Sequence, residues 1–397
     1  MRSRRFLQSM TVAGVLCSGL GGSALAAVPE RARDLGVPFD GTPGPLNAIT
    51  DVEGVRVGHV TLIAGDGKLV VGKGPVRTGV TAILPRGPAS TNEPVFAGWY
   101  AQNGNGEMTG TTWVEESGYL EGPVMITNTH SVGVVRDAVV RWRVSKGDPD
   151  ATEYWWSLPV VAETWDGWLN DINGFHVTTE HALAALDRAA AGPVAEGSVG
   201  GGTGMVCNGF KGGIGTASRR VPVFGQTYTV GVLVQCNYGR RANLRIAGVP
   251  VGREITENEP YAYVPSDKAE TGSIIVVVAT DAPLLPHQLK RIARRVPLGL
   301  GRTGSIAGNG SGDIFIAFST ANGGGAVVDK LVPVQMVPND ALDDLFKATV
   351  ESTEEAIVNA MVAARDMKGV DGRFVPGLPH DRLQEVLAKY GRLAKPR

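Results

Sequence analysis

The stretch Thr271-Gly-Ser-Ile-Ile-Val-Val-Val-Ala-Thr280 decides the fold of this chain of 397 residues. Its unbroken apolar run from Ile274 to Ala279 is short and rich in β-branched side chains, which predicts a buried strand. Other short segments rich in Val and Ile are predicted as strands at 79–84, 124–128, 227–236 and 313–319, with short strands and tight turns over 41–58. The chain is therefore built around β-structure.

Helical periodicity separates these strands. Apolar residues recur at spacings of three and four over 340–367, where Asn339 or Asp340 can cap the start and Gly369 lies beyond the end. Further helices are predicted at 131–141, 178–191 and 286–295. No linker, composition break or internal repeat divides the chain, so we expect one mixed α/β domain over 27–397 in layers of sheet and helix.

Composition excludes several classes of protein. The chain is 43% hydrophobic and 19% charged, which is typical of a globular core and not of a disordered chain. Its 54 glycines follow no G-X-Y period, so they are expected at turns and close backbone approaches rather than in a collagen-like helix. The net charge of −1, without a long basic run, argues against a nucleic-acid partner.

The first 26 residues have the pattern of a signal peptide. Three arginines within the first five residues precede a weakly apolar stretch over 6–20, and Ser-Ala-Leu-Ala at 23–26 suits cleavage after Ala26. The sequence leaves the choice between Sec and twin-arginine export open. We expect an exported protein, periplasmic or secreted, that has no membrane partner once the signal is removed, because no later segment is long enough to span a bilayer.

Common catalytic signatures are absent. The six histidines form no H-E-x-x-H or other compact metal spacing, and G-x-S-x-G and S-x-x-K are missing. The glycines at 200–204 match a phosphate loop poorly, and a tight turn is the preferred interpretation. Cys207 and Cys236 have no zinc-type spacing, so they are either buried thiols or one bridge in an oxidising compartment. We expect neither a metal nor an organic cofactor.

The Gly272-Ser273 pair carries the most chemistry. If the bond between the two residues is cut, Ser273 gains a free α-amine that can act as the general base for its own hydroxyl. Glycine suits the preceding position, because a residue without Cβ tolerates the strained peptide that the hydroxyl would attack. Taken by itself, however, the pair is better explained as a turn that opens a core strand.

Several blocks together change that balance. The segment Thr271–Arg291 resembles the autoprocessing segment of the DmpA/BapA family, which comprises L-aminopeptidase/D-esterases and β-peptidyl aminopeptidases. Five further blocks follow the family order along nearly the whole mature chain: 103–110, 127–133, 159–163, 200–205 and 309–315. The resemblance implies the four-layer αββα sandwich shared with ornithine acetyltransferases, with layers like those of N-terminal-nucleophile hydrolases.

The resemblance also implies self-cleavage before Ser273. The precursor would give an α fragment, 27–272, and a β fragment, 273–397, which stay folded together, and the family suggests a tetramer of such pairs. Ser311 and Asp313, in Gly-Ser-Gly-Asp, match the serine and acid that contact the nucleophile and its amine. The carboxylate of Asp313 would hold the ammonium group of Ser273 and raise the pKa of that amine.

Three more residues match family positions. Asn237 matches the asparagine that donates to the oxyanion, a role that suits an amide NH₂ group. Glu163 matches the glutamate that anchors the substrate's ammonium group, which would explain aminopeptidase action. Trp165 departs from the family, because some members have a tyrosine there as a second oxyanion donor, so the identity of that donor stays open. We expect Glu163 and Trp165 to bind substrate.

The resulting hypothesis is a serine aminopeptidase that works through an acyl-enzyme on Ser273. Its substrates would be short peptides, amides or esters with a free N-terminal amine and a β-amino acid or small α-amino acid first. Three rival hypotheses remain: an ornithine acetyltransferase-like acyl transferase, which uses a threonine nucleophile; a processed binding protein without turnover; and an uncut secreted scaffold.

Overall fold

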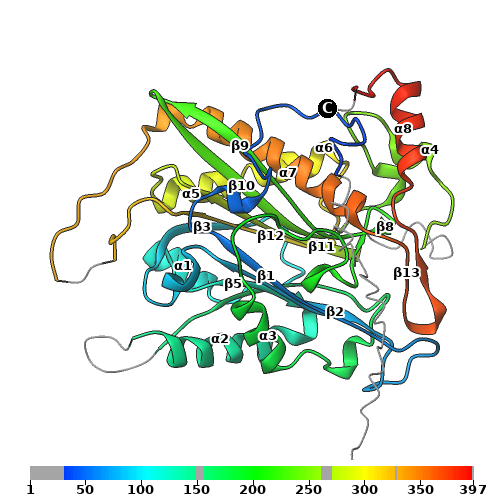
Figure 1. Ribbon diagram of the computed structural model, residues 1–397, viewed down its shortest axis with the longest axis horizontal. Helices are drawn as coiled ribbons and strands as arrows, with labels where there is room; N and C mark the ends of the chain where they lie inside the picture. The colour runs from blue at the N-terminus through cyan, green and yellow to red at the C-terminus, as the bar shows by residue number, and fades with distance from the viewer. Residues whose placement is uncertain (1–30, 149–155, 261–270, 327–328, 396–397) are drawn as a thin grey trace, which may run out of the picture.

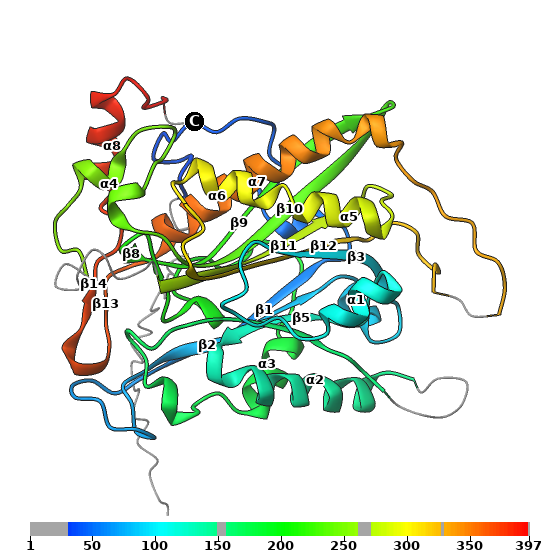
Figure 2. The same cartoon turned by 180° about the vertical axis from the view of Figure 1, so that it is seen from behind.

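The computed structural model describes residues 31–148, 156–260, 271–326 and 329–395. The predicted signal peptide, 1–26, lies outside these residues. Two β-sheets face each other, and helices cover the outer face of each sheet (Figure 1). The reverse view shows the same order of layers, with α2 and α3 on one side and α5, α6 and α7 on the other (Figure 2). The predicted four-layer αββα arrangement is confirmed.

The first sheet has the strand order β1-β2-β5-β6. Its strands are β1 (Arg56–Ala64), β2 (Val76–Leu84), β5 (Val124–Asn128) and β6 (Val160–Thr164). Helices α2 (Val132–Lys146) and α3 (Thr179–Asp187) bury apolar side chains against its outer face. Both β5 and β6 end beside the site described below, and they run parallel to each other.

The second sheet has the order β4-β3-β12-β11-β10-β9. Its strands are β3 (Val95–Ala101), β4 (Tyr119–Leu120), β9 (Gly213–Val223), β10 (Gln226–Asn237), β11 (Thr271–Thr280) and β12 (Gly310–Ser319). Strand β11 runs parallel to β12 and antiparallel to β10. Helices α5 (Pro286–Ala293), α6 (Val296–Arg302) and α7 (Asp343–Ala363) cover its outer face.

Side-chain alternation along β11 joins two apolar cores. Ile275 and Val277 belong to the core between the sheets, whereas Ile274 and Val276 belong to the core beneath the helices. A strand whose two faces are both buried reads as a continuous apolar run, which is why 274–279 shows no alternation of polar and apolar residues. The central position of β11 follows from this composition.

The remaining helices and strands are short. They are α1 (Thr111–Ser117), α4 (Val251–Glu254), α8 (His380–Lys389), β7 (Val206–Cys207), β8 (Phe210–Lys211), β13 (Met367–Lys368) and β14 (Phe374–Val375). Strands β7 and β8 form a hairpin at the end of the second sheet where β10 finishes. This hairpin contributes a backbone group to the site.

Three expectations need correction. The Gly272-Ser273 pair does not form a turn before the strand, because β11 begins at Thr271 and both residues are paired in the sheet. The helix expected over 340–367 occupies only Asp343–Ala363, since residues 339–341 form a 3-10 turn and Ala364 is extended. The short strands expected over 41–58 are wrong, because turns and a 3-10 helix at Ile49–Asp51 occupy this stretch and β1 begins only at Arg56. Strands β3, β6 and β9 were not predicted.

The glycines at 200–204 form a tight turn, as expected. A Cβ added at Gly201 would lie 2.2 Å from Oε1 of Gln235 and 2.8 Å from the carbonyl oxygen of Ile126. The turn therefore packs against both sheets where only glycine fits. Among the described residues, no helix is long and apolar enough to cross a membrane.

Candidate active site

Ser273 lies at the end of the second sheet, between two partner strands. It is opposite Asn237 of β10 on one side and opposite Gly312 of β12 on the other. The residue is buried, with 3% of its surface exposed. Gly272 precedes it in the ladder, and a Cβ there would lie 2.4 Å from the carbonyl oxygen of Asn237. A side chain at position 272 would thus push β10 and β11 apart.

Ser311 and Asp313 lie on β12, directly before and after Gly312, the residue that pairs with Ser273 of β11. The register pairs Gly272 with Ser311 and Ile274 with Asp313, so the Gly272–Ser273 peptide runs beside the Ser-Gly-Asp segment. Both polar side chains are fully buried, and Ser311 Oγ donates to Asp313 Oδ1 at 2.6 Å. The structure therefore brings a hydroxyl and a carboxylate next to the strand segment that contains the predicted cleavage point.

Asn237 is held at both ends of its amide. The backbone N–H of Val206 donates to Asn237 Oδ1, and Asn237 Nδ2 donates to the carbonyl oxygen of Trp165, each at 2.8 Å. These two bonds fix which end of the amide carries the donor. By alternation, Asn237 and Ser273 both project toward the first sheet, in line with Leu233 and Ile275.

Glu163 is a buried carboxylate at the end of β6, with 3% of its surface exposed. Thr129 Oγ1 donates to its Oε2 at 2.5 Å, and the backbone N–H of Glu107 donates to its Oε1 at 3.0 Å. Burial raises the pKa of Glu163 above its ordinary value, while these two hydrogen bonds work in the opposite direction. The site thus holds a carboxylate that is costly to leave unpaired when charged.

A loop glycine, Gly106, lies between this carboxylate and strand β12. A Cβ added at Gly106 would lie 3.2 Å from Glu163 Oε1 and 3.1 Å from Gly312 Cα. Gly312 pairs with Ser273. Gly106 therefore lies between the carboxylate of Glu163 and the residue of β12 that is opposite Ser273. Further along the strands, Gln235 Nε2 donates to Thr164 Oγ1 at 2.8 Å and joins the ends of the two sheets.

Trp165 contributes its backbone to the site. Its carbonyl oxygen accepts the hydrogen bond from Asn237, whereas its side chain is 41% exposed. The indole ring packs against the backbone of Gly167, so that a Cβ added at Gly167 would lie 2.9 Å from the indole Nε1. Trp165 is therefore placed between Glu163 and Asn237, and its predicted contact with substrate stays a prediction.

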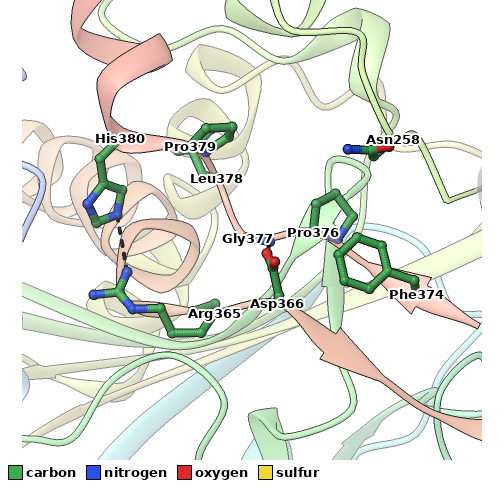
Figure 3. Close-up of a pocket in the computed structure, with 10 residues that line it drawn as sticks. Asn258, Arg365, Asp366, Phe374, Pro376, Gly377, Leu378, Pro379 and His380 are labelled. Carbon is green, nitrogen blue, oxygen red and sulfur yellow. Dashed lines mark hydrogen bonds between the residues drawn. The ribbon is translucent and has the colours of Figure 1, made fainter.

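A separate pocket lies beside the start of α8. Its volume is about 580 Å³, and Phe374, Pro376 and Leu378 line it together with polar residues that include Arg365 (Figure 3). Nη1 of Arg365 lies 3.4 Å from Nε2 of His380. Figure 3 shows the two side chains pointing toward each other. The lining residues include none of the predicted site residues. Within the described ranges, no group of three or more His, Cys, Asp or Glu side chains could hold a metal ion.

Three contributors were not predicted from the sequence: Thr129, the N–H of Val206 and the N–H of Glu107. Thr129 lies in the block 127–133, but its hydrogen bond to Glu163 depends on β5 and β6 ending side by side. The N–H of Val206 has no sequence signature at all, because every residue except proline carries that group. For Thr129, the signal that could have found it was a hydroxyl directly after a buried strand.

Comparison with known sequences gives consistent results. The sequence profile described as peptidase family S58 matches residues 47–375. The chain is 58% identical over 397 residues to the β-peptidyl aminopeptidase BapA of Sphingosinicella microcystinivorans, covering 96% of this chain and 97% of that protein. It is 50% identical over 371 residues to the BapA of Sphingosinicella xenopeptidilytica, covering 90% of each.

Solved structures agree in fold. The L-aminopeptidase D-Ala-esterase/amidase of Ochrobactrum anthropi superposes with a TM-score of 0.86 and 53% identity, covering 92% of this chain and 99% of that one. That protein is described as a prototype serine aminopeptidase with a variant of the N-terminal-nucleophile hydrolase fold. The similarity in fold therefore covers most of the chain, and the family match over 47–375 includes the strand ends that carry the site.

Proposed function

Because the chain belongs to peptidase family S58 and is a serine aminopeptidase, we propose that it cuts itself before Ser273 and uses the new N-terminal serine as its nucleophile. The observation that carries this proposal is the pairing of Ser273 with Asn237 on one side and with the Ser-Gly-Asp segment of β12 on the other. The buried carboxylate of Glu163 is separated from Gly312 of this segment by Gly106.

Self-cleavage begins with the hydroxyl of Ser273. Its Oγ attacks the carbonyl carbon of Gly272, the peptide C–N bond breaks, and the Gly272 carbonyl becomes an ester on Oγ while the nitrogen becomes the α-amine of Ser273. Water then hydrolyses the ester and releases 27–272 from 273–397. Because Gly272 has no side chain, it fits against the backbone of Asn237 and tolerates the strained peptide that the hydroxyl attacks.

Substrate turnover repeats the same chemistry on another molecule. The free amine of Ser273 takes the proton of Oγ, and Oγ attacks the carbonyl carbon of the substrate's first residue. Asn237 has two N–H donors, one of which binds the carbonyl of Trp165, and we assign the second to the developing oxyanion. The leaving amine takes the proton, and water hydrolyses the acyl-enzyme.

Asp313 and Ser311 serve the amine of Ser273. The carboxylate, which accepts the hydrogen bond of Ser311, stabilises the protonated amine that forms each time the hydroxyl is deprotonated. Ser311 and Asp313 come directly before and directly after Gly312, the residue of β12 that pairs with Ser273, and this register supports the assignment. They act on the main-chain nitrogen, whereas the hydroxyl points toward the first sheet.

Glu163 would select substrates with a free N-terminus. A buried carboxylate regains its lost solvation when an ammonium group pairs with it, whereas an acylated amine offers no charge. The fixed separation between this anchor and Ser273 would place the first carbonyl of the substrate at the nucleophile, and Trp165 would contact the first residue. We propose β-amino and small α-amino acids there, in keeping with the names of the relatives.

Export and assembly complete the proposal. We propose that residues 1–26 direct the chain out of the cytoplasm and that the cut chains associate as a tetramer of pairs. The bond between the buried Cys207 and Cys236 supports an oxidising compartment. The segment 329–338 extends away from the sheets after β12 (Figure 1), and its exposed Leu331, Val334 and Met336 offer apolar surface for association.

A panel of paired substrates tests the proposed function. The p-nitroanilides of β-alanine, L-alanine and D-alanine are assayed beside their N-acetylated forms, with wild type, Ser273→Ala and Ser305→Ala. Ser305 follows a glycine as Ser273 does but lies outside β11, so its variant is the matched control. We expect turnover of free-amine substrates only, and none by Ser273→Ala. Equal cleavage of acetylated substrates, or an active Ser273→Ala, would contradict the proposal.

A further inference from the structure

Two buried cysteines lie directly beside the oxyanion donor. Cys207 ends β7, and Cys236 precedes Asn237 on β10. Their sulfurs are bonded, with the two Cα atoms 5.6 Å apart, and neither residue is exposed. Since 29 residues of sequence separate them, this bond joins two segments that are distant along the chain.

Hydrogen bonds flank the disulfide on both sides. The N–H of Val206 donates to Asn237 Oδ1 at 2.8 Å, and the N–H of Asn208 donates to the carbonyl oxygen of Tyr238 at 2.7 Å. Each of these bonds joins a residue next to Cys207 with a residue after Cys236. The orientation of the Asn237 amide therefore depends on how β7 lies against the end of β10.

The hairpin that carries Cys207 is closed by its own contacts. The buried amine of Lys211 donates to the carbonyl oxygens of Met205 and Gly212, each at 2.8 Å, and burial lowers the pKa of Lys211 to about 7. The N–H of Gly212 also donates to the carbonyl oxygen of Met205. The hairpin thus behaves as one unit. It continues into β9, which pairs with β10 as far as Cys236, so the disulfide adds a covalent restraint where this ladder ends.

We propose that the Cys207–Cys236 disulfide is a positioning element for Asn237, so that the enzyme reaches full turnover only after this bond has formed. The inference rests on the proposed function of Asn237 as oxyanion donor. A donor accelerates acyl transfer when it is aimed before the reaction starts, because no free energy is then spent on reorienting it. The crosslink provides that restraint next to the donor itself.

Formation of the bond couples activity to redox state. The thiols of Cys207 and Cys236 give up two protons and two electrons to an oxidant that itself contains a disulfide, which is reduced to two thiols. Such oxidants act in compartments outside the cytoplasm. A chain retained in the cytoplasm would fold with two thiols and an amide that is less firmly oriented.

Cys207→Ala tests the inference, with Val221→Ala as the matched control. Val221 is buried in the same apolar core but lies on β9, away from Asn237. Both variants lose stability, so melting temperature is measured alongside kinetics. We expect Cys207→Ala to lower kcat roughly ten- to a hundred-fold at a temperature where it is fully folded, with little change in KM. Val221→Ala keeps the wild-type kcat.

A double-mutant cycle with Asn237→Ala shows whether the effect passes through the amide. If the disulfide acts by positioning Asn237, the double variant is no slower than Asn237→Ala alone. A general structural effect would instead multiply the two losses. If turnover of Asn237→Ala is below detection, Asn237→Ser, which keeps a shorter donor, replaces it in the cycle.

The outcomes separate this inference from the proposed function. An active wild type with an equally active Cys207→Ala, multiplying losses in the cycle, or alkylation of both cysteines in unreduced, denatured wild type would overturn the inference alone. A wild type that neither cuts itself nor hydrolyses free-amine substrates would overturn the proposed function, and this inference with it.

Discussion

The two halves of the site are built in different ways. The nucleophile half, with Ser273, Asn237 and the Ser-Gly-Asp segment, lies in the hydrogen-bonded ladder of β10, β11 and β12, where register sets the position of each residue. In the proposed substrate-anchoring half, Glu163 is the penultimate residue of the edge strand β6, and one side chain and one loop N–H hold its carboxylate. The proposed bond-making groups thus lie on three paired strands of one sheet, whereas the carboxylate of Glu163 is oriented by groups that follow a strand or lie in a loop.

Gly312 joins the two halves, and a substitution there should damage both. A Cβ at this position would lie 2.4 Å from the carbonyl oxygen of Asn105, so Gly312→Ala must displace either β12 or the loop that carries Gly106. We expect kcat/KM to fall roughly a thousand-fold, with kcat lowered and KM raised, because misplacement by about 1 Å alone costs about a hundred-fold. Steady-state kinetics of Gly312→Ala and wild type measure kcat and KM separately. An effect on only one of the two parameters would mean that the halves are not joined here.

Asn237→Ala should break the nucleophile half alone. Removing one oxyanion donor typically lowers kcat roughly 10²- to 10³-fold, and KM should stay near the wild-type value. The pre-steady-state rate of acyl-enzyme formation measures the step directly. A rise in KM with unchanged kcat would place Asn237 in substrate binding instead.

Glu163→Gln should break the anchoring half alone. The amide keeps the shape of the carboxylate but carries no charge for the substrate's ammonium group, so we expect KM to rise about ten- to a hundred-fold and self-cleavage to proceed normally. Because burial raises the pKa of Glu163, kcat/KM of the wild type should fall on acidification from a higher pH than an ordinary carboxyl would give. Loss of self-cleavage in this variant would contradict the separation of the halves.

Thr129→Val should have the smallest effect on kcat/KM. It tests whether a single hydrogen bond tunes the carboxylate of the anchoring half. Valine has nearly the shape of threonine but removes the hydrogen bond that lowers the pKa of Glu163. The acid limb of kcat/KM should therefore move to higher pH, with only a few-fold loss at neutral pH. A pH profile of wild type and variant measures the shift. An unchanged profile would show that Thr129 does not tune the carboxylate.

The same difference explains what sequence alone could predict. Strand β11 is visible because 274–279 is a continuous apolar run, and β5 of the other sheet is visible because 124–126 is a short one; the structure contains both strands. Strand β9 was not predicted because it contains Arg219. The side chain of Arg219 is buried, with its Nη2 2.7 Å from Oε2 of Glu355 in α7. Such a charge looks like a surface residue until its partner is known.

The site divides in the same way. Family resemblance named Ser273, Asn237 and Glu163, because side chains carry a sequence signal, and the structure shows that they lie on β11, β10 and β6. The N–H groups of Val206 and Glu107, which orient Asn237 and Glu163, carry none. Backbone contacts of this kind depend on tertiary approach and were not predictable from local pattern.

The most direct test of the account is the intact mass of wild type and Ser273→Ala, measured under denaturing conditions with N-terminal sequencing of each fragment. The account predicts two wild-type chains, the smaller beginning at Ser273, and one uncut chain in the variant. A single chain in both proteins, or a cut at another position, would contradict the claim that Ser273 becomes the N-terminal nucleophile.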